Sequence, residues 1–579
     1  MAPPGRRTAV VTNRHVVAGD DVELWLRPRD DVVKERPPEI RGGDTTFELD
    51  HGPFHEWERT VSLTASLGPA APGHHAEQVE VVETVRYELA VPFWRPLFAF
   101  ALRRHLKSTP RTDGKAPWWA PPAVLDARAS TVLSLLCLIG AVAGYLGTLL
   151  TQVLTYAAEQ FGADRSAQGA LLASVRIGVL ISLVVVASAD RRGRRAVLIV
   201  AVIGSCLFTS LGALAPGMVW LGTTQTFARA LSTVVALLVA IVAVEEMPSG
   251  SRAWALSVLT MTGGLGAGLC VANLLYVDLA AGAWRIAFVV PLLAIYPCWR
   301  IGRRMPETRR FTRHRHQVVS VDGTVVLAPE GEGGPPAEPR PTPAPHDDAT
   351  GTSRTPAEPV ATGSGFRWGR FVLLGASGFL WSMFLAPAAQ FLNEFLRTER
   401  GFSGALIAVF VLATNTPAGI GIVAGGRLAD RHGRRRIGAI GIVGGVTFTV
   451  ISYLTFGWPL WVSSMVASII GALAVPALAV YGPELFPTGQ RAKANGGLQV
   501  VSVAGSSVGL LLVGWLGDAF GSLGPAIAVV AAGPALLVVL VLAFYPETAG
   551  RELEDLNPVD RIPSVPPASA PDGSTLPRP

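Results

Sequence analysis

Two halves of this chain carry the same short motifs at nearly one spacing. The segment ASADRRGRR at residues 187–195 returns as RLADRHGRR at 427–435. The patterns Glu-x-x-Pro-x-x-x-Arg and Pro-Glu-Thr also occur twice. The recurring positions, each pair 238 to 240 residues apart, are Asp190 and Asp430, Glu245 and Glu484, Pro306 and Pro546, and Gln152 and Gln390. Unrelated matches would not share one offset, so the sequence indicates an internal duplication.

The sequence between these motifs consists largely of apolar runs. Half of the residues are hydrophobic, 16% are charged, and the mean hydropathy is +0.39. A helix that crosses a bilayer needs about 20 apolar residues. Twelve runs approach or exceed that length, near residues 131–156, 167–189, 196–214, 218–244, 253–279, 284–299, 371–396, 404–428, 437–456, 460–481, 494–516 and 523–544. We therefore predict an all-α membrane protein with twelve transmembrane helices in two pseudo-symmetric six-helix halves. Such paired halves around a central site are the architecture of secondary transporters.

Clusters of arginine set the predicted orientation. They follow the second, sixth and eighth runs, so they lie in loops on one side of the membrane. The positive-inside rule assigns that side to the cytoplasm. We expect a multi-pass protein of the cell membrane with both termini cytoplasmic. Because short loops account for many of these arginines, the net charge of +6 does not indicate nucleic-acid binding.

The rest of the chain divides around the two membrane halves, which we place at 126–300 and 370–548. Residues 301–369 are predicted to be a cytoplasmic linker, largely disordered, because they are rich in Pro, Glu, Gly and Thr. Within them, two β-rich runs around Asp322-Gly323 are a hairpin signal. Residues 549–579 are predicted to be a disordered cytoplasmic tail.

Residues 1–125 form a polar amino-terminal region with two interpretations. Strand-like stretches such as 79–91 are followed by an amphipathic helix pattern with basic residues at 93–104. The region is either a small α+β domain whose last helix closes its own core, or it ends in a helix that lies on the anionic inner leaflet. Nothing in the duplicated core requires this region.

The loops around Asp190 and Asp430 carry more information than charge alone. A glycine at 193 and 433 allows a sharp turn between two helices. The aspartates can pair with neighbouring arginines or accept backbone N–H groups. The alternative for the arginines is that they merely hold the loops on the cytoplasmic side.

The segment Gly426 to Arg435 resembles the signature loop of the major facilitator superfamily, although the first copy has Val186 at the position of Gly426. The Glu-x-x-Pro-x-x-x-Arg and Pro-Glu-Thr motifs resemble the sugar-porter and metabolite:proton symporter branches. The seventh run does not keep the paired-glutamine pattern of sugar porters, which leaves the branch open. By this resemblance, charges on the cytoplasmic side form a latch between the halves. The expected gate residues are Asp190, Arg191, Gly193, Arg194, Glu245, Arg252, Gly426, Asp430, Arg431, Gly433, Arg434, Glu484 and Arg491.

Polar residues inside the apolar runs are the candidates for substrate binding. Arg176 and Arg229 lie deep in the second and fourth runs, where a charge is costly and should face the bundle interior. They would bind an anion or polar substrate, or form structural contacts with a carboxylate or backbone carbonyls. Matching polar faces occur in the first and seventh runs and suggest cavity lining. The alternative for their outer members, Glu159 and Arg397, is a position at the external interface. The predicted substrate-binding residues are Gln152, Tyr156, Arg176, Arg229, Gln390, Asn393, Glu394 and Asn415.

Taken together, these features predict a secondary active transporter. Its expected substrate is a small polar metabolite, sugar-like or an organic acid, moved by alternating access with proton coupling. Glu394, Glu245 and Glu484 are the candidate proton carriers. The sequence has no P-loop, zinc-ligand spacing or nucleophile elbow, so we expect no enzyme activity, catalytic residue, metal or cofactor. The expected partners are the substrate, membrane lipid and protons, and the expected state is a monomer. The alternatives are efflux of amphiphilic compounds, or a non-transporting membrane sensor or lipid-binding protein.

Overall fold

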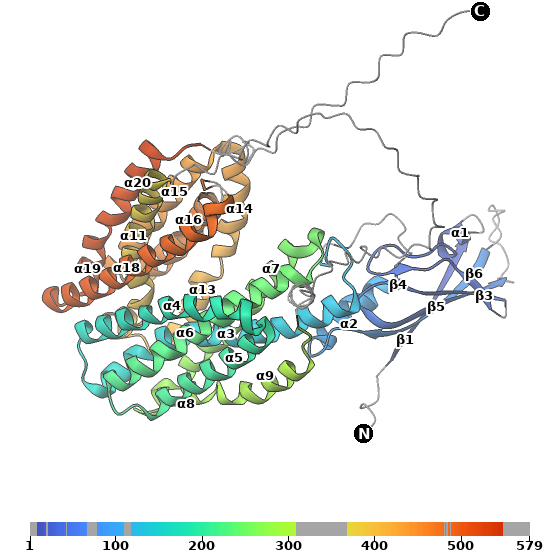
Figure 1. The fold of residues 1–579 in the computed structure, drawn as a ribbon, viewed down its shortest axis with the longest axis horizontal. Coiled ribbons are helices and arrows are strands. Elements are labelled where there is room, and N and C mark those ends of the chain that lie inside the picture. Colours follow the sequence, from blue (N-terminus) through green and yellow to red (C-terminus); the bar gives the residue numbers. More distant parts are fainter. Residues whose placement is uncertain are drawn as a thin grey trace, which may run out of the picture.

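The computed structural model describes residues 8–18, 21–41, 43–65, 78–108, 117, 119–307, 367–479, 481, 485–486 and 488–547, apart from the side chains of a few residues within these ranges. The predicted hairpin around Asp322-Gly323, nearly all of the linker and the tail at 549–579 lie outside the described residues. The described chain forms an amino-terminal sheet domain followed by a helical membrane bundle (Figure 1).

The amino-terminal region folds into an antiparallel sheet with one long helix. Its strands pair in the order β1-β6-β5-β4-β2, and β3 pairs with β4. The elements are β1 (Ala9–Ala18), α1 (Val22–Trp25), β2 (Lys34–Glu35), β3 (Glu39–Arg41), β4 (Asp44–His51), β5 (Phe54–Ala65), β6 (Gln78–Leu89) and α2 (Arg95–Leu106). The strand predicted at 79–91 is β6, and the helix pattern at 93–104 is α2.

Helix α2 closes the core of the sheet domain. Leu102 and Leu106 are buried against Phe54, Trp57 and Val85 of the sheet. This arrangement agrees with the first of the two interpretations of the region. The other end of α2 contacts the membrane bundle, so the helix also connects the two parts of the protein.

A buried charge network lies inside the sheet domain. The guanidinium of Arg59 donates to Glu35 from Nε at 2.9 Å and from Nη2 at 2.8 Å, and both side chains are fully buried. Arg29, also fully buried, lies 3.3 Å from Glu83. The indole of Trp57 donates to Glu35 at 2.9 Å. Because buried charges are costly unless paired, this network ties the long strands to the segment at residues 25–35.

The first membrane half follows directly. Its elements are α3 (Ala127–Phe161), α4 (Arg165–Arg192), α5 (Arg194–Ser210), η2 (Leu211–Leu214), α6 (Met218–Glu246), η3 (Ser249–Ser251), α7 (Arg252–Ala272), η4 (Asn273–Leu275), η5 (Val277–Leu279), α8 (Trp284–Val289) and α9 (Leu292–Arg304). Pro291 lies where the sixth span breaks into α8 and α9, because proline offers no backbone N–H to the helix.

The second half repeats this plan. Its elements are α11 (Trp368–Gln390), α12 (Leu392–Glu394), η6 (Phe395–Glu399), α13 (Gly404–Asn415), α14 (Ala418–His432), α15 (Arg434–Leu454), α16 (Trp458–Ala479), α18 (Thr488–Phe520), α19 (Leu523–Val530) and α20 (Ala532–Phe544). Pro417 separates α13 from α14 within the eighth span.

Twelve helices in the described residues are long and apolar enough to cross a membrane. Each helix overlaps one of the twelve predicted runs, and the observed and predicted bounds differ mainly at the ends of the helices. The sixth, for example, extends from the predicted 284–299 to Trp284–Arg304. The prediction of an all-α membrane fold with two six-helix halves and a small amino-terminal α+β region is confirmed.

The two halves meet at one end of the bundle. We call the end with the arginine loops at 191–195 and 431–436 the basic end, and the other the far end. Helix α4 packs along α18 near the far end, where a Cβ on Gly169 would approach the carbonyl oxygen of Leu510 to 2.6 Å. Toward the basic end, where α2 and the sheet lie, the ribbons of the halves diverge (Figure 1).

Candidate substrate-binding site

A cavity of about 430 Å³ lies between the halves. Helices α4 and α6 of the first half and α11 and α18 of the second supply its walls. Its polar lining residues are Arg176, Arg229, Thr233, Ser382, Gln390, Gln499, Ser502 and Ser506. A neighbouring cavity shares Arg176, Arg229 and Gln390 and adds Thr151 and Gln225. The structure therefore places three of the eight predicted substrate-binding residues around one central space.

The two arginines give this space a positive character. Arg229 Nη1 donates to the carbonyl oxygen of Gly147 at 2.8 Å. Arg176 has no hydrogen-bond or ion-pair partner among the described residues. It lies close enough to Arg229 for the two positive charges to repel each other. Both side chains are only partly buried, because they face the cavity. The backbone contact of Arg229 fits the structural interpretation of that residue, whereas Arg176 is left with a free cationic group.

The residues that line the two cavities include no Asp or Glu within the described part of the chain. The arginines are therefore not neutralised by a neighbouring carboxylate. An arginine that faces an apolar or partly hydrated interior binds carboxylate and phosphate groups strongly. Its planar guanidinium group can donate two parallel hydrogen bonds to two oxygens of such a group. The hydroxyl and amide groups of Ser502 and Gln499 can in addition bind hydroxyl or carbonyl groups of a polar solute.

The matching polar faces of the first and seventh spans meet at the far end. Asn393 Nδ2 donates to Gln152 Oε1 at 3.0 Å and to the Gln152 carbonyl at 3.1 Å. Thr151 Oγ1 donates to Gln390 Oε1 at 2.6 Å. Gln152 and Asn393 are buried. These residues join the halves in this conformation, and of this group only Thr151 and Gln390 also line a cavity.

The outer members of the same faces form a charged cluster between the halves. Arg397 Nε donates to Glu159 Oε1 at 2.6 Å, and its Nη1 donates to Asp278 Oδ1 at 2.7 Å. The guanidinium also lies over the ring of Tyr156, 4.4 Å from its centroid. Tyr156, predicted as a substrate ligand, is thus covered by Arg397 in this state. Glu159 and Arg397 lie partly exposed.

A second far-end cluster was not identified from the sequence. Asp518 of α18 accepts the backbone N–H of Ser166 at 2.7 Å, and Arg165 pairs with Glu399 at 2.9 Å. Asp278 was missed as well, and its second oxygen accepts the N–H of Gly404 at 2.6 Å. One sequence pattern could have revealed these residues. They are charged residues that lie at the ends of apolar runs, on the side of the membrane opposite the arginine loops.

The two remaining substrate candidates lie apart from the central cavity. Glu394 is buried in α12 and interacts with Gln168 and Thr155 of the first half. Asn415 is exposed at the end of α13 and lines neither central cavity in the described structure.

At the basic end, the duplicated motifs form the same tight turn between two helices in each half. Gly193 and Gly433 have φ of 93° and 95°, and each connects one helix directly to the next. Glu547 of the Pro-Glu-Thr motif accepts the backbone N–H groups of Arg434 at 2.9 Å and Arg435 at 3.3 Å. A carboxylate at this position satisfies free N–H groups at a helix start and interacts favourably with the helix dipole.

The first half has the equivalent contact. Glu307 accepts the backbone N–H of Arg195 at 3.2 Å at the start of α5. A Cβ on Gly433 would lie 2.7 Å from the Glu547 carboxylate, so a side chain there would displace the cap. The Pro-Glu-Thr motif, assigned by resemblance only, therefore has a local structural role in both halves.

The remaining predicted gate residues are only partly described. Arg194 forms an ion pair with Glu245, and Arg252 Nε lies 3.4 Å from the carbonyl oxygen of Met247. Both contacts join residues of the first half. Arg431 is exposed on the basic end. Glu484 and the side chains of Asp190, Arg191, Asp430 and Arg491 lie outside the described residues, as does the surrounding of Gly426. A latch across the halves remains a prediction.

Comparison with known protein families gives a match in the second half of the membrane bundle. The family model of the Major Facilitator Superfamily matches residues 370–569. This match covers the second membrane half and about a third of the chain, so that half is similar to the superfamily. Related members share a bundle of two related halves that moves solutes by alternating access.

Solved structures of membrane transporters have a similar fold. A crystal structure of a mutant of the nucleoside transporter NupG has a TM-score of 0.55 at 12% identity, covering 72% of this chain and 100% of that chain. The inward open conformation of the xylose transporter XylE from E. coli has a TM-score of 0.53 at 16% identity, covering 74% and 99%. At these identities the likeness concerns the fold alone. No curated protein sequence matches significantly.

Proposed function

We propose that this protein is a secondary active transporter for a small organic-acid metabolite, and that the described conformation is open toward the cytoplasm. The observation that carries the proposal is the pair Arg176 and Arg229 at the central cavity, with Arg176 unpaired among the described residues. An anionic substrate would complete the charge balance that the protein leaves open.

The orientation follows from the arginine loops. The positive-inside rule assigns the basic end to the cytoplasm. The contacts between the halves gather at the far end, so the central cavity would be accessible from the cytoplasmic side. Both termini would then be cytoplasmic, and the protein would reside in the cell membrane.

A neutral sugar-like solute is the second candidate. Gln390, Gln499, Ser502 and Ser506 line the same cavity and can hydrogen-bond to hydroxyl groups. The motif resemblance to sugar porters and metabolite symporters supports this candidate as well. Two cations without a lining carboxylate nevertheless favour the anion, since a neutral solute would leave both charges uncompensated.

Proton coupling is the proposed energy source, because the chain has no nucleotide-binding loop. Glu394 is the buried carboxylate nearest in the sequence to the cavity residue Gln390, and it contacts the first half. A carboxylate at the interface between the halves can take up a proton in one conformation and release it in another.

The test is uptake of labelled organic acids and neutral sugars into proteoliposomes, with and without an inward proton gradient. We expect saturable, gradient-stimulated uptake of an organic anion. Arg176→Lys should keep partial uptake with a raised KM, and Arg176→Ala should abolish it. Arg300→Gln, an exposed arginine at the end of α9, is the matched control.

Each alternative has a distinct result. Uptake of a sugar with no response to organic acids would favour the neutral candidate. Well-folded protein that transports neither class would support the sensor or lipid-binding interpretation. If Arg176→Lys and Arg176→Ala lose folded protein equally, Arg176 has a structural role only.

A further inference from the structure

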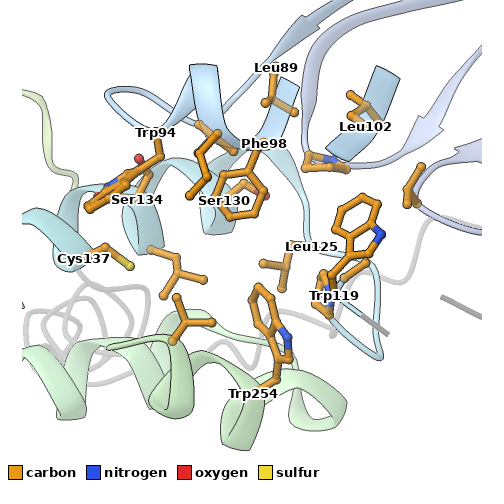
Figure 2. Close-up of a pocket in the computed structure, with 18 of the residues that line it drawn as sticks. Leu89, Trp94, Phe98, Leu102, Trp119, Leu125, Ser130, Ser134, Cys137 and Trp254 are labelled. Atoms are coloured by element: carbon orange, nitrogen blue, oxygen red, sulfur yellow. The ribbon is translucent and has the colours of Figure 1, made fainter. Parts of the chain in front are cut away.

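A second cavity lies where the amino-terminal domain meets the membrane bundle (Figure 2). Its volume is about 140 Å³. The walls come from the sheet domain, α2, the segment at 119–125, the start of α3 and one face of α7. The lining is mostly apolar, and includes Phe98, Trp119, Leu133, Trp254, Met261 and Leu265. An apolar cavity of about 150 Å³ stays dry and accommodates a hydrocarbon group.

The cavity is held open by contacts that fix the domain to the bundle. Trp94 Nε1 donates to the carbonyl oxygen of Ser134 in α3 at 3.1 Å. Thr131 Oγ1 donates to the carbonyl oxygen of Ala90 at 3.0 Å. Figure 2 shows Trp94, Phe98, Trp119 and Trp254 arranged around the space. The walls therefore come from two parts of the protein joined by hydrogen bonds.

The cavity continues onto the surface that faces lipid. Met261 and Leu265 of α7 line it and are 61% and 58% exposed. Both lie in the fifth candidate span, Trp254–Leu279. Leu97 of α2 lines the cavity as well and is 66% exposed. A hydrocarbon chain could therefore enter sideways from the bilayer, without passing through water.

One polar group in the wall has no partner. Ser130 of α3 is 5% exposed and lines the cavity, and its Oγ forms no hydrogen bond within the described residues. A buried hydroxyl without a hydrogen-bond partner is energetically unfavourable. A carbonyl oxygen near the head of an acyl chain would accept this hydrogen bond.

Helix α2 carries charge suited to a lipid headgroup. Its exposed face is apolar at Leu97 and Phe100 and basic further along, and the exposed Phe93 lies just before the helix. The exposed Arg103, Arg104 and Lys107 have no ion-pair partner among the described residues. Basic residues beside a membrane attract anionic lipid.

The direction of α2 determines which of its two parts, the apolar one or the basic one, lies closer to the membrane bundle. The helix begins beside Ser134, seven residues into α3, about 10 Å along that helix at 1.5 Å per residue. It ends inside the sheet domain, where Asn13 Nδ2 donates to the Leu106 carbonyl at 2.8 Å. The apolar turn thus lies near the bundle, and the basic turn lies nearer the aqueous domain.

We propose that this cavity binds a segment of one acyl chain of an anionic phospholipid from the leaflet at the basic end, with the rest of the chain lying on the lipid-facing surface of α7. The chain lies among the aromatic and aliphatic walls, Ser130 donates to an ester carbonyl, and Arg103, Arg104 and Lys107 attract the phosphate. This site is separate from the central cavity, and the proposal does not depend on which solute is transported.

The experiment uses the full-length protein in nanodiscs that contain a trace of phosphatidylglycerol with a photoreactive acyl chain. After irradiation, we expect peptides from residues 89–102, 119–137 and 254–265 to carry the label in preference to other lipid-facing peptides. Val258→Trp, which fills the cavity from α7, should lower this labelling about tenfold, equivalent to about 1.4 kcal/mol of binding free energy. Leu269→Trp adds the same side chain at an exposed position of α7 outside the cavity and should leave the labelling unchanged.

The headgroup is tested separately. Phosphatidylcholine and a free fatty acid with the same photoreactive chain should label the cavity more weakly than phosphatidylglycerol. Replacing Arg103 and Arg104 by Gln, both at exposed positions, should remove the preference for phosphatidylglycerol while keeping the label in the cavity. Equal labelling by the three probes in the unmodified protein overturns the assignment to an anionic phospholipid. Diffuse labelling that Val258→Trp does not reduce overturns the site itself.

Discussion

Arg397 provides the sharpest test of how the two halves are held together. It forms two ion pairs with Glu159 and Asp278 of the first half, at 2.6 and 2.7 Å, and lies over Tyr156. The charged side chains are 24–42% exposed, so each pair should contribute only about 0.2–1 kcal/mol. The contact with the aromatic ring adds about 0.5–1 kcal/mol. Together these contacts favour the closed far end by about 1–3 kcal/mol, a factor of about 5 to 150 in population.

Arg397→Gln should therefore shift the population toward conformations with an open far end. Spin labels on Leu279→Cys and Trp458→Cys, exposed positions at the far end of opposite halves, would report the distance by pulsed electron spectroscopy. The four native cysteines are buried, which favours selective labelling. We expect a new population at longer distance in the variant.

Arg285→Gln is the matched control, because Arg285 lies at the same end but donates to Ala213 and Ala215 of its own half, at 2.8 and 2.9 Å. It should lower thermal stability without changing the distance distribution. An identical distribution in Arg397→Gln and the unmodified protein would refute the idea that this cluster holds the halves together.

Three further predictions concern other parts of the fold. Glu547→Ala removes an acceptor for two helix-start N–H groups and should lower stability by about 1–3 kcal/mol, as measured by thermal unfolding in detergent. An unchanged midpoint of thermal unfolding would contradict this capping role. Arg59→Met should destabilise the sheet domain by about 3–5 kcal/mol, since it leaves Glu35 buried without its main partner. Limited proteolysis of residues 1–106 at increasing urea concentration measures this change, and an unchanged urea midpoint would count against it. Asp430→Asn should slow transport sharply while membrane insertion remains normal, because the predicted latch uses that charge in one conformation only; normal turnover would exclude such a role.

Much of the membrane fold was accessible from the sequence because the bilayer imposes local rules. A segment in lipid must satisfy its backbone hydrogen bonds within itself, so length and hydropathy suffice to locate each span. The duplicated glycines at 193 and 433 likewise predict a turn from their own chemistry, and both have positive φ. The duplication then determines that the two halves share one plan.

The sequence by itself thus determined the twelve spans, the paired halves and the set of polar residues inside them, since each of these depends on a short stretch of chain. Only the tertiary structure decided which polar residues meet. Gln152 and Asn393 join the halves, whereas Arg176 faces a cavity, although both kinds of residue interrupt apolar runs in the same way. The attachment of α2 to α3 is equally invisible in the sequence, because it depends on hydrogen bonds between residues about 40 positions apart. Contacts between distant segments reflect how helices pack and which conformation the two halves adopt, and no local pattern encodes either.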